Sequence, residues 1–217
     1  MINPDDPTGP RLNRVAPDSR LIATPARGLF FGNRGCLHDR AGLAPKGASG
    51  GDRLRWAGRR WIICLTRYKN WRRPLAPPGG YSGLFFLDEA TALAAGHRPC
   101  ALCRREAYQS FKHAAGVSAL SADALDLRLH TERLDGNRRR LHATPWADLP
   151  IGAMVLVEGA PHLALADRLT PWRPDGYGPP VARPRLGSAA SLTPPTSLAA
   201  LRAGQPARLH PSAEPNG

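Results

Sequence analysis

The chain of 217 residues lacks a long apolar run. No stretch approaches the ~20 consecutive apolar residues that a membrane-spanning helix needs. Its first residues, MINPDDPTGPRLNR, place acids and prolines where a signal peptide has a basic start and an apolar core. These absences predict a soluble, cytoplasmic protein.

Acidic residues and lysine are also scarce. The chain has 17 acidic residues against 30 basic ones, of which only 3 are lysine, so its formal net charge is +13. Such a charge favours a polyanionic partner through long-range attraction and counterion release. The abundance of Arg, Ala, Pro and Gly would equally follow from a GC-rich coding sequence. Charge alone therefore leaves a nucleic-acid partner as one of two explanations.

Cysteine is limited to four residues, all in the first half: Cys36, Cys64, Cys100 and Cys103. In a reducing cytoplasm these do not form a disulfide framework. A Cys-x-x-Cys pair at a helix start, with two further thiols near strands or turns, suits a tetrahedral zinc site. Four small buried hydrophobes are the alternative. A redox pair is less favoured, because no βαβ pattern precedes the motif.

Local patterns predict short elements separated by loops. β-Branched and aromatic residues predict strands within 29–38, 60–68 and 81–87, and a hairpin at 149–167 that turns at 158–161. Cap residues and three- to four-residue spacing predict helices at 88–96, 100–116, 121–137 and 192–204. Asp88 caps the first of these helices and Gly96 follows its end. Residues 1–28, rich in proline, are expected to form a flexible arm.

The segment FFLDEATALAAGHRPCALCRR, at about residues 84–105, resembles the zinc-binding domain of Ada-type DNA-repair methyltransferases and the related zinc modules of some nucleases. It has their acidic helix start, small-residue helix and Arg-Pro-Cys-x-x-Cys motif, with His97 at the family's aromatic position, where packing is expected. The family has two more ligands upstream in Cys-x3-Cys, where this chain has Cys64 and Tyr68. The resemblance implies zinc held by Cys64, Cys100 and Cys103, with Cys36 or His38 as the fourth ligand.

These patterns predict an α+β fold. A small treble-clef-like or ribbon-like zinc element with short strands and two helices is expected at 29–116, as an Ada-like region. A mixed α/β region with the hairpin would follow at 117–210, its role unassigned, and a tail at 211–217.

Residues 53–73, RLRWAGRRWIICLTRYKNWRR, contain eight basic residues and no acid, with tryptophan and tyrosine interleaved. Cations on one face would follow phosphates, and an exposed Trp would stack on bases. The alternative is a charged edge strand with tryptophan in the core. We expect at least one Trp in the core and the arginines outside, which is compatible with both interpretations. The candidate nucleic-acid contacts are Arg59, Arg60, Arg67, Lys69, Trp71, Arg72, Arg73, Arg104 and Arg105.

Three functions remain open. The first is a binding module with structural zinc and a nucleic-acid surface, for DNA more than RNA. The second, implied by the resemblance, is alkyl transfer from DNA phosphotriesters to Cys64 as a zinc-bound thiolate acceptor. The third is a structural or regulatory module that binds a protein. A nuclease lacks acidic clusters for magnesium, since His38-Asp39 is an isolated pair.

A histidine-based catalytic cluster would need His130, His142 and Glu132 to meet. Nothing in their spacing requires this, so we expect exposed or core histidines and assign no catalytic residue.

Overall fold

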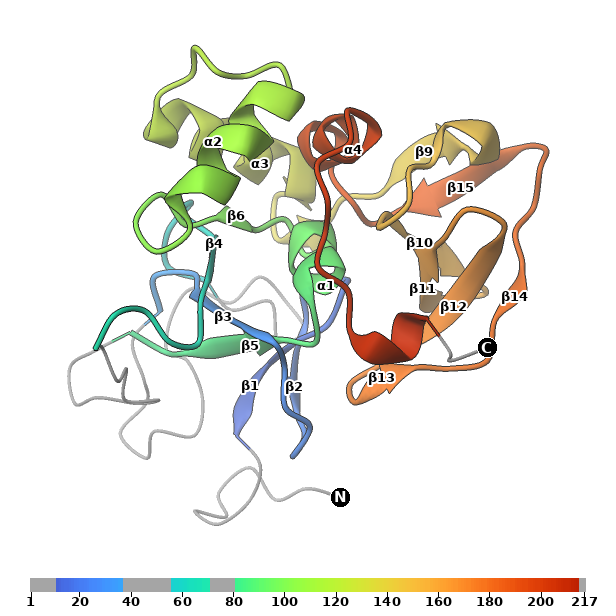
Figure 1. Cartoon of the computed structure of the whole chain (residues 1–217), viewed down its shortest axis with the longest axis horizontal. Helices are drawn as coiled ribbons and strands as arrows, with labels where there is room; N and C mark the ends of the chain where they lie inside the picture. Colours follow the sequence, from blue (N-terminus) through green and yellow to red (C-terminus); the bar gives the residue numbers. More distant parts are fainter. Residues whose placement is uncertain (1–10, 37–55, 71–80, 215–217) are drawn as a thin grey trace.

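The first sheet collects strands from the first 99 residues of the chain. The computed structural model describes residues 11–36, 56–70 and 81–214 (Figure 1). The strands of the first sheet are β1 (Leu12–Val15), β2 (Leu21–Ala23), β3 (Phe30–Asn33), β4 (Ile62–Cys64), β5 (Leu84–Phe86) and β6 (Arg98–Pro99). They lie in the order β2-β1-β5-β3-β4-β6. The expected strands within 29–38, 60–68 and 81–87 are present as β3, β4 and β5.

The expected flexible arm differs from the structure over residues 11–28, because β1 and β2 form an antiparallel pair there. Val15 and Leu21 are fully buried on the sheet, while Pro17 lies in the turn between the strands. Proline is compatible with such a turn, so proline content was a poor guide to this segment. Residues 1–10 lie outside the described part.

Four α-helices occur among the described residues: α1 (Glu89–Ala94), α2 (Arg105–Ala114), α3 (Ala122–Arg133) and α4 (Pro195–Arg202). The Asp88 side chain caps α1 by accepting from the Thr91 N–H, as expected. Gly96 follows with φ +82°, and an added Cβ there would meet the Arg133 side chain at 2.5 Å. Helix α2 begins five residues later than expected, so Cys100 and Cys103 lie in the turn that precedes it. No helix in the described ranges is long and apolar enough to cross a membrane.

A second sheet occupies the C-terminal half. It contains β9 (His142–Pro145), β10 (Met154–Val157), β11 (Ala160–Ala164), β12 (Arg168–Arg173), β13 (Gly176–Tyr177), β14 (Val181–Ala182) and β15 (Ser188–Ser191). Their order is β13-β12-β11-β10-β15-β9, with β14 paired to β12. The expected hairpin is β10–β11, which turns at Glu158 and Gly159 with positive φ. The short strands β7 (Leu134–Asp135) and β8 (Arg138–Arg139) form a separate hairpin after α3.

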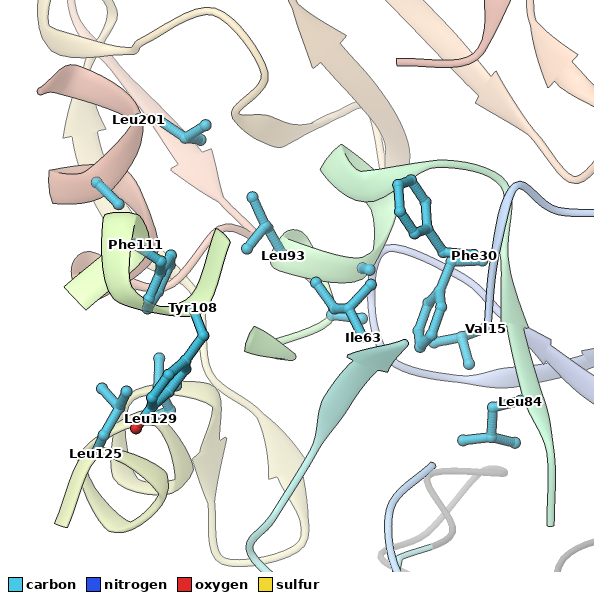
Figure 2. Packing of buried hydrophobic residues seen from close by; sticks show 14 of the residues in the cluster. Val15, Phe30, Ile63, Leu84, Leu93, Tyr108, Phe111, Leu125, Leu129 and Leu201 are labelled. Carbon is cyan, nitrogen blue, oxygen red and sulfur yellow. The ribbon is translucent and has the colours of Figure 1, made fainter. Parts of the chain in front are cut away.

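One apolar core joins both halves of the chain. Ile63 of the first sheet, Phe111 of α2, Leu125 of α3 and Leu201 of α4 belong to the same buried cluster (Figure 2). Helix α4 packs against α2 and α3, and α1 lies between the two sheets (Figure 1). The α+β class is confirmed, and the expected regions 29–116 and 117–210 share this core.

Candidate metal centre

Three of the four cysteines come together. The Sγ atoms of Cys64, Cys100 and Cys103 all lie within 4.8 Å of one another. Their exposed fractions are 0%, 7% and 6%, and no cysteine of the chain is in a disulfide. The three residues form a buried group that can hold a metal ion, which we call the cysteine centre.

Strand pairing creates this proximity across 36 residues of sequence. Strands β4 and β6 are parallel, with Ile63 opposite Pro99, and the Cys100 N–H donates to the Ile63 carbonyl at 2.9 Å. Cys64 and Cys100 therefore leave their strands side by side. The Arg104 N–H donates to the Cys100 carbonyl at 3.1 Å, and this turn returns Cys103 to the same place.

The alternation of β4 decides which face the centre occupies. Ile63 points into the main core, whereas Cys64 points to the opposite face of the sheet, since successive side chains alternate. There the three cysteines form a small apolar cluster with Phe31, against which Phe85 packs. The centre is thus shielded from solvent.

The thiols influence each other's protonation. The pKa of Cys100 is lowered, chiefly by hydrogen bonds from the Cys103 and Cys64 thiols and further by backbone N–H groups. Hydrogen bonds to the other two thiols, followed by burial, raise the pKa of Cys64, and the bond to Cys100 raises that of Cys103. Metal ligation requires thiolates, so binding would release protons from Cys64 and Cys103.

The donor set fits a small thiophilic ion. Tetrahedral zinc with Zn–S near 2.3 Å requires sulfurs about 3.8 Å apart, which falls within the observed 4.8 Å limit. The Leu102 N–H also points at the Cys100 sulfur at 3.4 Å, which stabilises a thiolate there.

The expected fourth ligands have different outcomes. Cys36 is buried but is not a member of the cysteine centre, and its carbonyl accepts from the Ser82 N–H at 2.7 Å. His38 lies outside the described residues. The choice between them stays a prediction.

The expected nucleic-acid contacts are partly exposed. Arg59, Arg60, Arg67, Lys69 and Arg105 are exposed. Trp61, by contrast, is completely buried, which confirms the expectation of a core tryptophan with arginines outside. The expected contacts Trp71, Arg72 and Arg73 lie outside the described residues.

Arg104 differs from the other expected contacts because it turns inward. Its Nη2 lies 2.7 Å from Oε1 of the buried Glu89, and its guanidinium lies 4.7 Å from the Phe30 ring centroid. The Arg104 side chain is only 10% exposed, so most of its surface is used in these interior contacts.

Packing and backbone contacts account for His97 and His142. His97 is buried, 5.1 Å from the Trp61 ring and 4.6 Å from the Phe86 ring, as expected for packing. The Glu132 carboxylate accepts from the Thr196 N–H at 2.9 Å, at the start of α4. His142 bonds through Nε2 to the Glu132 carbonyl, not to its carboxylate.

Sequence reasoning missed a pair of buried cations. The Arg34 and Arg133 side chains each lie 4.0 Å from the Trp61 ring centroid, and both are 0% exposed. Burial lowers the pKa of Arg34 to about 9. The Arg133 guanidinium donates to the Gly96 and Arg59 carbonyls. The spacing and charge pattern of the sequence do not indicate that Arg133 packs against Gly96. The glycine itself was the only local sign of a close contact there.

Comparisons with protein-family models, with curated proteins and with solved structures find no match to this chain.

Proposed function

We propose that this protein binds one structural zinc ion at the cysteine centre and presents a basic surface to nucleic acid, DNA more than RNA. The convergence of three buried sulfurs from β4 and from the turn before α2 carries the proposal. Thiolate-rich tetrahedral sites favour zinc, and three cysteines completed by a fourth cysteine or a histidine form a common structural zinc ligand set. Cys36 or His38 would complete the zinc site, as the resemblance to Ada-type domains implies.

Burial supports a structural role over alkyl transfer. An acceptor thiolate must reach the phosphotriester it attacks, and the Cys64 side chain has no exposed surface. A metal ion at this position would instead tie β4 to the turn at 100–103. Alkyl transfer to Cys64 is therefore the weaker alternative.

The nucleic-acid part rests on charge and exposure. Arg59 and Arg60 precede β4 and Arg67 and Lys69 follow it, and all four are exposed. Arg60 forms an ion pair with Asp123, in which Nη2 lies 3.0 Å from Oδ1, so its charge is partly neutralised. The other three cations, with the net charge of +13, would supply salt-dependent contacts to phosphates.

The zinc test is elemental analysis of protein purified without added metal. Wild type is expected to contain one zinc per chain, and Cys100→Ser to lose it. Cys36→Ser and His38→Ala serve as a matched pair, of which only the variant lacking the fourth ligand should lose zinc. A folded, reduced wild type without zinc would sink the metal proposal.

The nucleic-acid test is fluorescence anisotropy with random-sequence duplex DNA at several salt concentrations, with RNA as a competitor. Binding that weakens linearly on a log–log salt plot is expected, and Arg59→Ala with Arg67→Ala should reduce the slope. Arg173→Ala with Arg185→Ala, two exposed arginines of the second half, is the charge-matched control. Salt-independent binding, or none, would leave the protein-interaction alternative.

A further inference from the structure

A cavity of about 550 Å³ opens between β1, the segment after β2, and β5. Its walls include three arginines, Arg11, Arg14 and Arg27, with the hydroxyls of Thr24 and Thr66 beside them. None of the described residues that line it is acidic. The volume is that of a typical small-ligand site, and the charged groups in its lining are all positive.

The central cation is held in place before any ligand arrives. The Arg14 guanidinium donates to the Ala26 carbonyl and to Oδ1 of the buried Asn13, and it lies 4.7 Å from the Phe85 ring centroid. These contacts fix its orientation, so little side-chain entropy remains to be lost on binding. An exposed surface arginine without such partners would lack this preorganisation.

Among the described residues that line the cavity, no carboxylate balances the three cations. Burial and then the nearby charge of Arg27 lower the pKa of Arg14, so the two guanidiniums repel each other. An anion between them would remove this repulsion. Planar guanidinium groups match the oxygens of a phosphate in bidentate geometry.

The cavity lies on the same sheet face as the cysteine centre. Arg14 pairs with Phe85, Phe85 with Phe31, and Phe31 with Cys64, so one lateral row crosses four adjacent strands. Three strand steps of about 4.8 Å place the backbones of Arg14 and Cys64 about 14 Å apart. The Phe31 and Phe85 rings meet edge to face at 5.6 Å in the middle of this row.

We propose that the cavity binds a phosphate group of a nucleic-acid strand through Arg11, Arg14 and Arg27. The inference rests on the proposed nucleic-acid function and names one point of contact for it. All three arginines lie in the segment that its proline content predicted to be a flexible arm. A metal ion at the other end of the row would fix the position of β4. Since β4 pairs with β3, β3 with β5, and β5 with β1, the ion would also help to fix the strands that line the cavity.

The experiment measures anisotropy of a fluorescein-labelled single-stranded 10-mer and of a duplex with the full-length, zinc-loaded chain. The test variant is Arg11→Ala with Arg27→Ala, and Arg14→Lys keeps charge while removing the planar fork. The control is Arg173→Ala with Arg185→Ala, which removes two exposed positive charges that neither proposal assigns to binding. Circular dichroism and zinc content establish that each variant is folded.

We expect at least tenfold weaker binding in the Arg11/Arg27 variant and a salt slope reduced by one to two, with a smaller loss in the control. Equal losses in the two double variants would overturn the cavity inference while the proposed function stands. If wild type binds neither oligonucleotide, both the proposed function and the assignment of the phosphate to a nucleic-acid strand are overturned. In that case a thermal shift with inorganic phosphate that disappears in the Arg11/Arg27 variant would retain a phosphate site, and its absence would overturn that as well.

Discussion

The two sheets bury different kinds of side chain. Beneath the six-stranded sheet lie Arg34, Arg133 and His97, together with the Arg98–Asp126 ion pair at 2.7 Å. The buried polar residues of the seven-stranded sheet are mostly hydroxyl-bearing, and its clusters are built around residues such as Met154. Buried charge is costly unless it is paired or hydrogen-bonded. The first sheet therefore depends more than the second on pairing and hydrogen bonding of buried charges.

One carboxylate bonds to both halves of the chain. Oδ2 of the buried Asp88 accepts from the Tyr177 hydroxyl at 2.7 Å and from the His210 N–H at 3.1 Å, while Oδ1 caps α1. Tyr177 belongs to β13 of the second sheet. A residue that sequence reasoning chose as a helix cap also connects the two halves.

The largest expected effect on the first sheet is that of Trp61→Ala. We expect the free energy of unfolding to fall by about 4 kcal/mol, because a large buried ring is lost. Trp61→Leu should recover part of this loss by filling space, but not the contact with Arg34 and Arg133. Urea unfolding measures both, and a Leu variant as stable as wild type would show that the two cations contribute nothing through the ring.

Metal removal should affect the two sheets unequally. If free zinc exceeds the dissociation constant a thousandfold, the ion stabilises the fold by about 4 kcal/mol. Hydrogen exchange after chelation should therefore increase first in β4 and at 100–103, and later in β10 and β11. Uniform acceleration of hydrogen exchange in both sheets would contradict a local structural role.

Zinc affinity should also fall as the pH is lowered, because Cys64 and Cys103 then keep their protons.

Asp88→Asn tests the junction between the sheets. One amide nitrogen would replace an acceptor oxygen, and the loss of charge-assisted hydrogen bonds should cost about 2 kcal/mol. Tyr177→Phe, which removes a single partner, should cost less. Glu158→Gln, at the exposed hairpin turn, is the control. Urea midpoints equal to that of the control would show that the network does not hold the halves together.

The smallest expected effect is the acid sensitivity of His130. Burial, followed by the charges of Arg133 and Arg59, lowers its pKa from 6.5 to about 4. The unfolded chain then binds more protons between these values, so stability is full above pH 6.5 and declines as the pH falls towards 4. His130→Gln should flatten part of this decline between pH 7 and 5 in urea unfolding. An unchanged profile would assign the decline to other groups.

Local signals predicted the elements best where a few neighbouring residues decide the conformation. The Asp88 cap, the Gly96 stop and the Glu158-Gly159 turn each act within one turn or hairpin. The strands β1 and β2 were missed because they are short and their turn contains proline. The ion pair of Arg104 with the buried Glu89 could not be foreseen, because a position next to Cys103 says nothing about a carboxylate 15 residues earlier in the chain.

The sequence by itself determined that Cys100 and Cys103 lie close together, because three residues of spacing in a turn leave little choice. It also determined the α+β class through caps and alternation. Only the tertiary structure decided that Cys64 joins them, that two arginines contact the Trp61 ring, and that Arg14 shares a row with the cysteine centre. These placements depend on pairing between strands far apart in the chain, and the register of such pairs is set by burial of whole faces rather than by local spacing.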